Sequence, residues 1–123
     1  MSSHLSKTEY RIMEYFWSTG EKYTFGELMK YFNEEEDKNW KKQTLNTFLS
    51  RLLDKGLLER KKEETKAYYG AALTKAEFNQ RKAKAILEEC YEGKISHFIA
   101  ALTGNNAITK VDEQELIAHI LDK

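Results

Sequence analysis

The sequence predicts a mainly α-helical protein with one small β-hairpin, organised as two consecutive units. Three observations predict this class. Hydrophobic residues recur at helical spacing, Ser/Thr–x–x–Glu capping boxes precede several of these segments, and two short alternating segments follow a glycine-terminated helix. The 123 residues, 41% of them hydrophobic, suffice for one domain or two small ones.

Two capping boxes predict the first two helices. The box at residues 6–9 precedes apolar residues at helical spacing and predicts a helix that ends at Gly20. The box at residues 24–27 predicts a second helix, which we expect to fray in the acidic run at residues 34–37.

A third helix and a hairpin follow. The helix has one apolar face, because its leucines and phenylalanine fall at i, i+3, i+4, i+7 and i+8: Leu45, Phe48, Leu49, Leu52 and Leu53. Gly56 is expected to end it, and residues 57–62 and 66–73 are expected to be strands around a Lys-Glu-Glu-Thr turn. Three helices followed by a hairpin over residues 1–73 resemble a winged helix-turn-helix domain.

Residues 74–123 are expected to form a separate helical domain of three helices. A capping box at residues 74–77 opens a long helix, a shorter helix stops at Gly104, and Asp112 with Glu115 opens the last one. The apolar stripes are more surface than one small unit can hide, so we expect them to pair across a two-fold axis. The predicted dimer contacts are Ile86, Leu87, Ile95, Phe98, Ile99, Leu102, Leu116, Ile117, Ile120 and Leu121. The alternative is a monomer in which these helices pack on the first domain.

Overall neutrality hides a basic segment. The chain has 20 Lys and Arg against 20 Asp and Glu, but residues 9–37 carry 3 basic and 8 acidic residues, and residues 38–66 carry 9 basic and 4 acidic. Because local potential rather than net charge steers a polyanion, the second segment is a candidate nucleic-acid surface.

The polar face of the third helix suits the major groove of DNA. Amide side chains suit adenine, the threonine methyl suits that of thymine, and lysines at a helix N-terminus suit phosphate. The predicted contacts on this helix are Lys41, Lys42, Gln43, Thr44, Asn46, Thr47, Ser50 and Arg51. Those around the hairpin turn are Arg60, Lys61, Lys62 and Lys66. The alternative is a solvated polar face and a solvated basic strand, and the glutamates of the hairpin favour that alternative.

The two tryptophans have different interpretations. Trp17 lies on the apolar stripe of the first helix and is expected in the core. Trp40 precedes the third helix. We expect it to hold the turn against the second helix, the alternative being exposure beside a sugar-phosphate edge.

The sequence offers no catalytic or metal-binding pattern, so we predict neither an enzyme nor a cofactor. The three histidines share no metal-ligand spacing, and no phosphate-binding glycine loop is present. The single cysteine, Cys90, fits a reducing compartment. Without a signal peptide or a membrane-length apolar run, a cytoplasmic location is expected.

Two segments resemble a known family. TEYRIMEYFWSTG and NWKKQTLNTFLSRLLDKGLLERKK look like the BlaI/MecI-type penicillinase repressors, winged-helix repressors with copper-responsive CopY-type relatives. The matching positions are Trp40, Thr44, Thr47, Leu49, Arg51, Leu52, Lys55 and Gly56. GKISHFIAALTGNN resembles the dimerisation region of that family.

The resemblance implies a homodimeric transcriptional repressor that binds palindromic operators in front of resistance genes, for example against beta-lactams. Base contacts would come from the start of the recognition helix, namely Lys42, Gln43, Thr44, Asn46 and Thr47.

Two departures from the family bear on induction. Penicillinase-type repressors are inactivated by proteolysis of an Asn-Phe bond, where this chain has Ala101-Leu102, so a different protease or none is implied. The C-terminal Cys-x-Cys pairs of the copper-responsive relatives are absent, which argues against copper sensing by thiolates.

A competing hypothesis is a winged-helix module that binds proteins and no DNA. Another is a repressor of the same family that answers to a metal or a different signal.

Overall fold

The computed structural model describes residues 5–104 and 109–121, and in these ranges the predicted class is confirmed. The chain divides into two compact units, Met1–Arg81 and Lys82–Lys123. The predicted domain boundary after residue 73 stays a prediction. Phe78, in the helix that follows this boundary, is buried in the core of the first unit.

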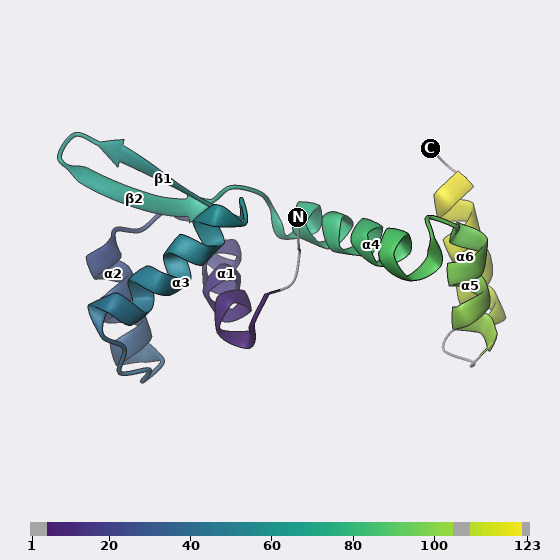
Figure 1. Ribbon diagram of the computed structural model, residues 1–123, viewed down its shortest axis with the longest axis horizontal. Helices are drawn as coiled ribbons and strands as arrows, with labels where there is room; N and C mark the ends of the chain where they lie inside the picture. The colour runs from purple at the N-terminus through teal and green to yellow at the C-terminus, as the bar shows by residue number, and fades with distance from the viewer. Residues whose placement is uncertain (1–4, 105–108, 122–123) are drawn as a thin grey trace. The chain divides into compact units, whose positions relative to one another are not determined.

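The first unit begins with two helices (Figure 1), and each of them starts at a capping box. Helix α1 (Lys7–Thr19) has the predicted capping box at Ser6 and Glu9 and ends at Gly20 with φ 68°. Helix α2 (Phe25–Lys30) has its box at Thr24 and Glu27. The segment continues as a π-helical turn, η1 (Tyr31–Glu35), which ends inside the acidic run where we expected the helix to fray.

Helix α3 (Lys42–Asp54) ends in a Schellman motif. Gly56 has φ 75°, Leu57 N donates to Leu52 O at 3.0 Å, and Gly56 N donates to Leu53 O at 3.0 Å. A left-handed residue is required there, which accounts for the glycine.

Strands β1 (Leu58–Glu63) and β2 (Lys66–Ala71) form the expected antiparallel hairpin, with Glu63 opposite Lys66. Tyr23, between α1 and α2, adds an isolated bridge, since its N–H and C=O both bond to Tyr69 at 2.9 and 2.7 Å. Of the two adjacent tyrosines of β2, Tyr69 is buried and Tyr68 is half-buried.

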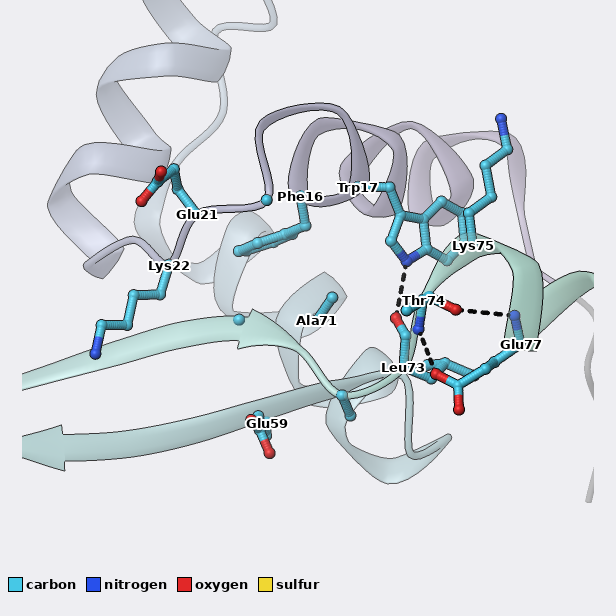
Figure 2. A pocket seen from close by; sticks show the side chains of 13 residues that line it. Phe16, Trp17, Glu21, Lys22, Glu59, Ala71, Leu73, Thr74, Lys75 and Glu77 are labelled. Carbon is cyan, nitrogen blue, oxygen red and sulfur yellow. Dashed lines mark hydrogen bonds between the residues drawn. The ribbon is translucent and has the colours of Figure 1, made fainter.

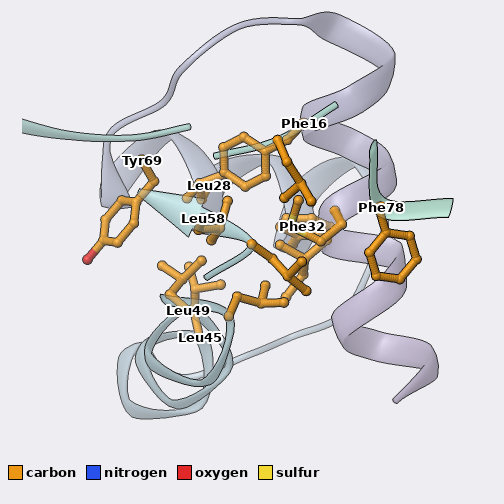
Figure 3. Close-up of a cluster of buried hydrophobic side chains, with 13 residues drawn as sticks. Phe16, Leu28, Phe32, Leu45, Leu49, Leu58, Tyr69 and Phe78 are labelled. Atoms are coloured by element: carbon orange, nitrogen blue, oxygen red, sulfur yellow. The ribbon is translucent and has the colours of Figure 1, made fainter. Parts of the chain in front are cut away.

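The core of the first unit joins every element (Figure 3). It consists of 13 buried side chains: Ile12, Met13, Phe16, Leu28, Phe32, Leu45, Leu49, Leu52, Leu57, Leu58, Tyr69, Leu73 and Phe78. Trp17, predicted to be core, is half-buried at the edge of this cluster, and its Nε1 donates to Leu73 O at 3.1 Å.

Three helices complete the chain: α4 (Lys75–Tyr91), α5 (Ile95–Gly104) and α6 (Lys110–Leu121). The capping box predicted for α4 is present, with Thr74 and Glu77 exchanging hydrogen bonds. Helix α5 ends at Gly104 as far as the description extends, because residues 105–108 lie outside it. The prediction that Asp112 and Glu115 open α6 is wrong, since Thr109 accepts from Asp112 N at 3.1 Å and the helix begins at Lys110.

Candidate nucleic-acid interface

Helix α3 separates an apolar face from a polar one. Leu45, Leu49 and Leu52 are fully buried on one side. The predicted contact residues on the other side are exposed, except that Thr44 is half-buried: Lys41, Lys42, Gln43, Thr44, Asn46, Thr47, Ser50 and Arg51. The structure therefore brings these residues together on one solvent-facing surface, which we call the α3 polar face.

The α3 N-terminus has no side-chain cap. Lys41 occupies the N-cap position, and its carbonyl accepts from Thr44 N and Leu45 N at 3.0 and 3.2 Å. Helix geometry leaves the N–H groups of Lys42 and Gln43 without an intrahelical partner. Backbone donors, the helix dipole and two exposed lysines thus meet at one point, and this arrangement favours an anion.

Thr47 uses its hydroxyl proton within the helix. Its Oγ1 donates to the Gln43 carbonyl at 2.9 Å, one turn earlier. The hydroxyl oxygen can then only accept a hydrogen bond, and the γ-methyl of this exposed residue is available for contact with a thymine methyl.

The strand register divides the basic residues of the hairpin between two faces. Arg60 lies opposite Tyr69 and Lys62 opposite Ala67, so both share the sheet face of the buried Leu58. That face is directed toward the helices, because Leu58 and Tyr69 pack in the same cluster as the leucines of α3.

Lys61 and Lys66 lie on the opposite face, together with acidic partners. Lys61 Nζ is 3.6 Å from Glu59 Oε2, and Lys66 lies across from Glu63, which pairs with Lys22. The outer face is therefore nearly balanced in charge, whereas Arg60 and Lys62 on the inner face have no ion pair with another described residue. Of the four predicted contacts in the hairpin, those two are best placed beside α3.

Trp40 holds the turn that leads into α3, as expected. Its ring centroid lies 5.1 Å from that of Phe32 and 5.3 Å from that of Phe48, which joins the end of α2–η1 to α3. Sequence reasoning missed Asn33, whose side chain bonds to both backbone groups of Trp40. The only local signal was an amide residue seven positions before the tryptophan.

A buried ion pair ties α1 to the end of α3. Glu9, 3% exposed, receives hydrogen bonds from Lys55 Nζ at 3.0 Å to both carboxylate oxygens, and from Ser6. Burial raises the pKa of the Glu9 carboxyl, but the hydrogen bonds from Ser6 and Lys55 outweigh burial and lower that pKa below its ordinary value. The matched position Lys55 therefore has a structural role here.

A crevice of about 580 Å³ lies where the hairpin leaves the core (Figure 2). Trp17, Ala71, Leu73 and Glu77 line part of it. The Trp17 indole donates to Leu73, and Glu77 is engaged in the cap of α4, so these polar groups already have protein partners. The crevice lies beside the Trp17–Leu73 hydrogen bond, which joins α1 to the residues that follow β2.

The predicted dimer residues whose side chains are described lie on α4 and α5, and none of them is buried within the chain. Ile86 and Ile95 are each 40% exposed, and Leu87, Phe98, Ile99 and Leu102 are half-buried. No residue of α5 is buried although most of the helix is apolar. The side chains of Leu116, Ile117, Ile120 and Leu121 lie outside the described part of the chain.

Among the residues that the structure describes, no three His, Cys, Asp or Glu side chains gather as a metal site, and Cys90 is an exposed free thiol. No helix in those ranges has the length and apolar character to cross a membrane.

A family model and several curated relatives are similar to this chain. The family model described as "Penicillinase repressor" matches residues 5–122. The methicillin resistance regulatory protein MecI of Staphylococcus aureus strain N315 is 22% identical over 120 residues, which cover 97% of this chain and 94% of that protein. MecI of Mammaliicoccus sciuri gives the same identity and coverage. A 16.5 kDa protein from the ptsI 3′ region of Latilactobacillus sakei is 24% identical over 115 residues, 94% of this chain and 77% of that protein.

Proposed function

The chain belongs to the penicillinase repressor family, and from that premise we propose that it binds a palindromic DNA operator as a homodimer and represses the adjacent gene. The family consists of transcriptional repressors, not enzymes. The observation that carries the proposal is the α3 polar face, where small polar and amide side chains surround an uncapped helix N-terminus that two lysines flank.

The α3 polar face supplies the base contacts in this proposal. The side-chain amides of Gln43 and Asn46 can donate to N7 and accept from the N6 amino group of adenine in the major groove, and Thr47 offers a methyl. Lys41 and Lys42, with the free backbone N–H groups beside them, take a phosphate. Thr44, which is half-buried, serves a phosphate contact better than a base contact.

The hairpin supplies contacts to the backbone or to the minor groove. Arg60 and Lys62 project from the sheet face that is directed toward α3, and no described acidic side chain neutralises them. Lys61 and Lys66 add positive potential from the other face, reduced by Glu59 and Glu63. Contacts of this kind position a protein on DNA but carry no sequence information.

A second copy of the chain covers the apolar residues of α4 and α5. A helix such as α5, mostly apolar but without one buried residue, is stable in water when a partner surface hides it. Two-fold pairing would place two α3 helices in successive major grooves, about 34 Å apart, which matches a palindromic operator.

The regulated gene is of the resistance type in this proposal, because the related MecI proteins carry methicillin resistance regulation in their name. We place the protein in the cytoplasm, where the operator is. Three alternatives for relief of repression stay open: cleavage at Ala101-Leu102, binding of a metal, and another signal.

A salt titration of binding to duplex DNA tests the proposal against the alternative of a protein-interaction module. A repressor that grips phosphates loses affinity steeply with salt, with a slope in log–log form of about −0.9 per neutralised phosphate. A module that binds only proteins shows no duplex binding even at low salt. Selection of bound fragments from the source genome would then supply the operator and the gene beside it.

A further inference from the structure

The start of α3 is fixed by something other than a cap. Most helices begin at a residue whose side chain accepts from the first turn, but Lys41 makes no such bond. In a helix that reads DNA, a shift of its first turn would move every base-contacting side chain, so the position of this turn has to be set by neighbouring elements.

Asn33 meets the backbone immediately before α3 in a paired arrangement. Its Nδ2 donates to Trp40 O at 3.0 Å, and its Oδ1 accepts from Trp40 N at 2.6 Å. The side-chain amide thus satisfies both backbone groups of one residue, as a neighbouring strand would. Trp40 is directly followed by Lys41, the N-cap of α3.

The loop between Asn33 and Trp40 contains two residues in an energetically unfavourable backbone conformation. Asp37 and Asn39 have φ of 54° and 57°, in the left-handed region that residues with a side chain rarely adopt. Lys38 N donates to Phe32 O at 2.9 Å, and the Trp40 ring lies between Phe32 and Phe48. Such a conformation persists only where surrounding contacts hold it.

We propose that Asn33 is a positioning residue for DNA reading: by bonding to both backbone groups of Trp40, it fixes where α3 begins and hence where the α3 polar face stands. This inference rests on the proposed function and extends it to a residue of η1 that contacts no DNA. The Trp40 ring packs the turn against Phe32 and Phe48. The Asn33 amide holds the backbone of Trp40, one residue before the N-cap of α3.

The consequence for binding is a difference between operator and random DNA. Contacts with bases depend on the exact placement of Gln43, Asn46 and Thr47, whereas contacts with phosphates tolerate a small shift. Loss of Asn33 therefore reduces the preference for the operator more than it reduces general affinity.

Asn33→Ala tests this, with Thr24→Ala as the matched control. Thr24 is the N-cap of α2 and accepts from Glu27 N at 3.2 Å, so its loss also costs hydrogen bonds in the same helical segment, but at the end remote from Trp40. Thermal unfolding of both variants compares their stability losses. Titrations with operator and with scrambled duplex give the ratio of the two affinities.

We expect Asn33→Ala to lower that ratio roughly tenfold, about what one lost base contact costs, and Thr24→Ala to leave it unchanged. The Trp40 amide, measured in free protein by hydrogen exchange, should lose protection only in Asn33→Ala. An unchanged ratio in Asn33→Ala, or an equal fall in both variants, overturns the inference. If wild type itself binds no duplex, the proposed function fails first, and the inference about DNA reading falls with it.

Discussion

Lys62→Ala should reduce the salt dependence of DNA binding more than Lys61→Ala, although the two lysines are adjacent and equally charged. Lys62 shares the hairpin face of Leu58 and Tyr69, which is directed toward the helices. Lys61 lies on the other face, with its Nζ 3.6 Å from Glu59. We therefore assign a phosphate contact to Lys62. Lys61 adds only a small positive potential near the DNA, because Glu59 partly neutralises its charge.

The magnitude follows from counterion release. One lost phosphate contact per chain, and therefore two in the dimer, makes the log–log slope less negative by about 1.8, so each tenfold fall in salt should increase the advantage of wild type over Lys62→Ala roughly sixtyfold. Lys61→Ala should change the slope by less than half of that. Both side chains are exposed, so neither change should alter the free energy of unfolding by more than about 0.5 kcal/mol.

Fluorescence anisotropy with a labelled operator and a scrambled duplex, measured at several salt concentrations, provides the slopes. Both duplexes should respond alike, because a phosphate contact is independent of sequence. Equal slopes for the two variants, or a larger change for Lys61→Ala, would refute the assignment of the hairpin faces.

The remaining predictions concern base reading, stability and assembly. Asn46→Ala should weaken operator binding by about 1–3 kcal/mol and leave random DNA nearly unaffected in the same titrations, and equal losses would contradict a base contact. Glu9→Gln should cost about 1–3 kcal/mol in urea unfolding at pH 7, since it weakens the bonds to Lys55. Because the folded-state pKa of Glu9 is lowered, its stabilising effect is complete well above an unfolded pKa of about 4.3 and disappears as the pH falls through the folded value. A difference between wild type and Glu9→Gln that persists at pH 2 would contradict this. Asp37→Gly should raise the free energy of unfolding by up to about 1 kcal/mol, because glycine accepts the φ of 54° without strain, and a loss of stability would argue against strain there. Leu102→Asp should give monomers by light scattering, and a variant that remains a dimer would contradict its placement in the interface.

The helix ends and the hairpin could be predicted because their signals are local. The capping boxes at Ser6, Thr24 and Thr74 involve residues three apart, and Gly56 marks a left-handed position that few other residues accept. The amphipathic spacing of α3 likewise predicted which of its faces is buried and which is exposed.

The features that were missed depend on contacts between distant residues. Glu9 was read as a capping residue, yet it is also buried and paired with Lys55, 46 positions away. Asn33 lies in the π-helical turn η1, and no periodic pattern in the sequence predicts such a turn or the hydrogen bonds that Asn33 makes from it. Thr109 was overlooked as the N-cap of α6 because Asp112, its partner three residues on, is itself a good capping residue.

The charge division of the hairpin was also beyond the sequence reading. Alternate residues of Arg60–Lys61–Lys62 face opposite sides in any strand, but apolar residues precede both faces, at Leu57 and Leu58, and only the structure shows that Arg60 and Lys62 share the buried face of Leu58. Once the register was known, the pairing of Lys61 with Glu59 and of Lys22 with Glu63 separated a balanced face from a basic one.

Sedimentation velocity of wild-type protein with a labelled operator duplex from the source genome, repeated at increasing salt, tests directly whether the protein binds DNA as a dimer. We expect a complex of two chains per duplex that dissociates steeply as salt rises, with a slope of several times −0.9 in log–log form. A single chain on the duplex, or no complex at the lowest salt, would contradict this expectation.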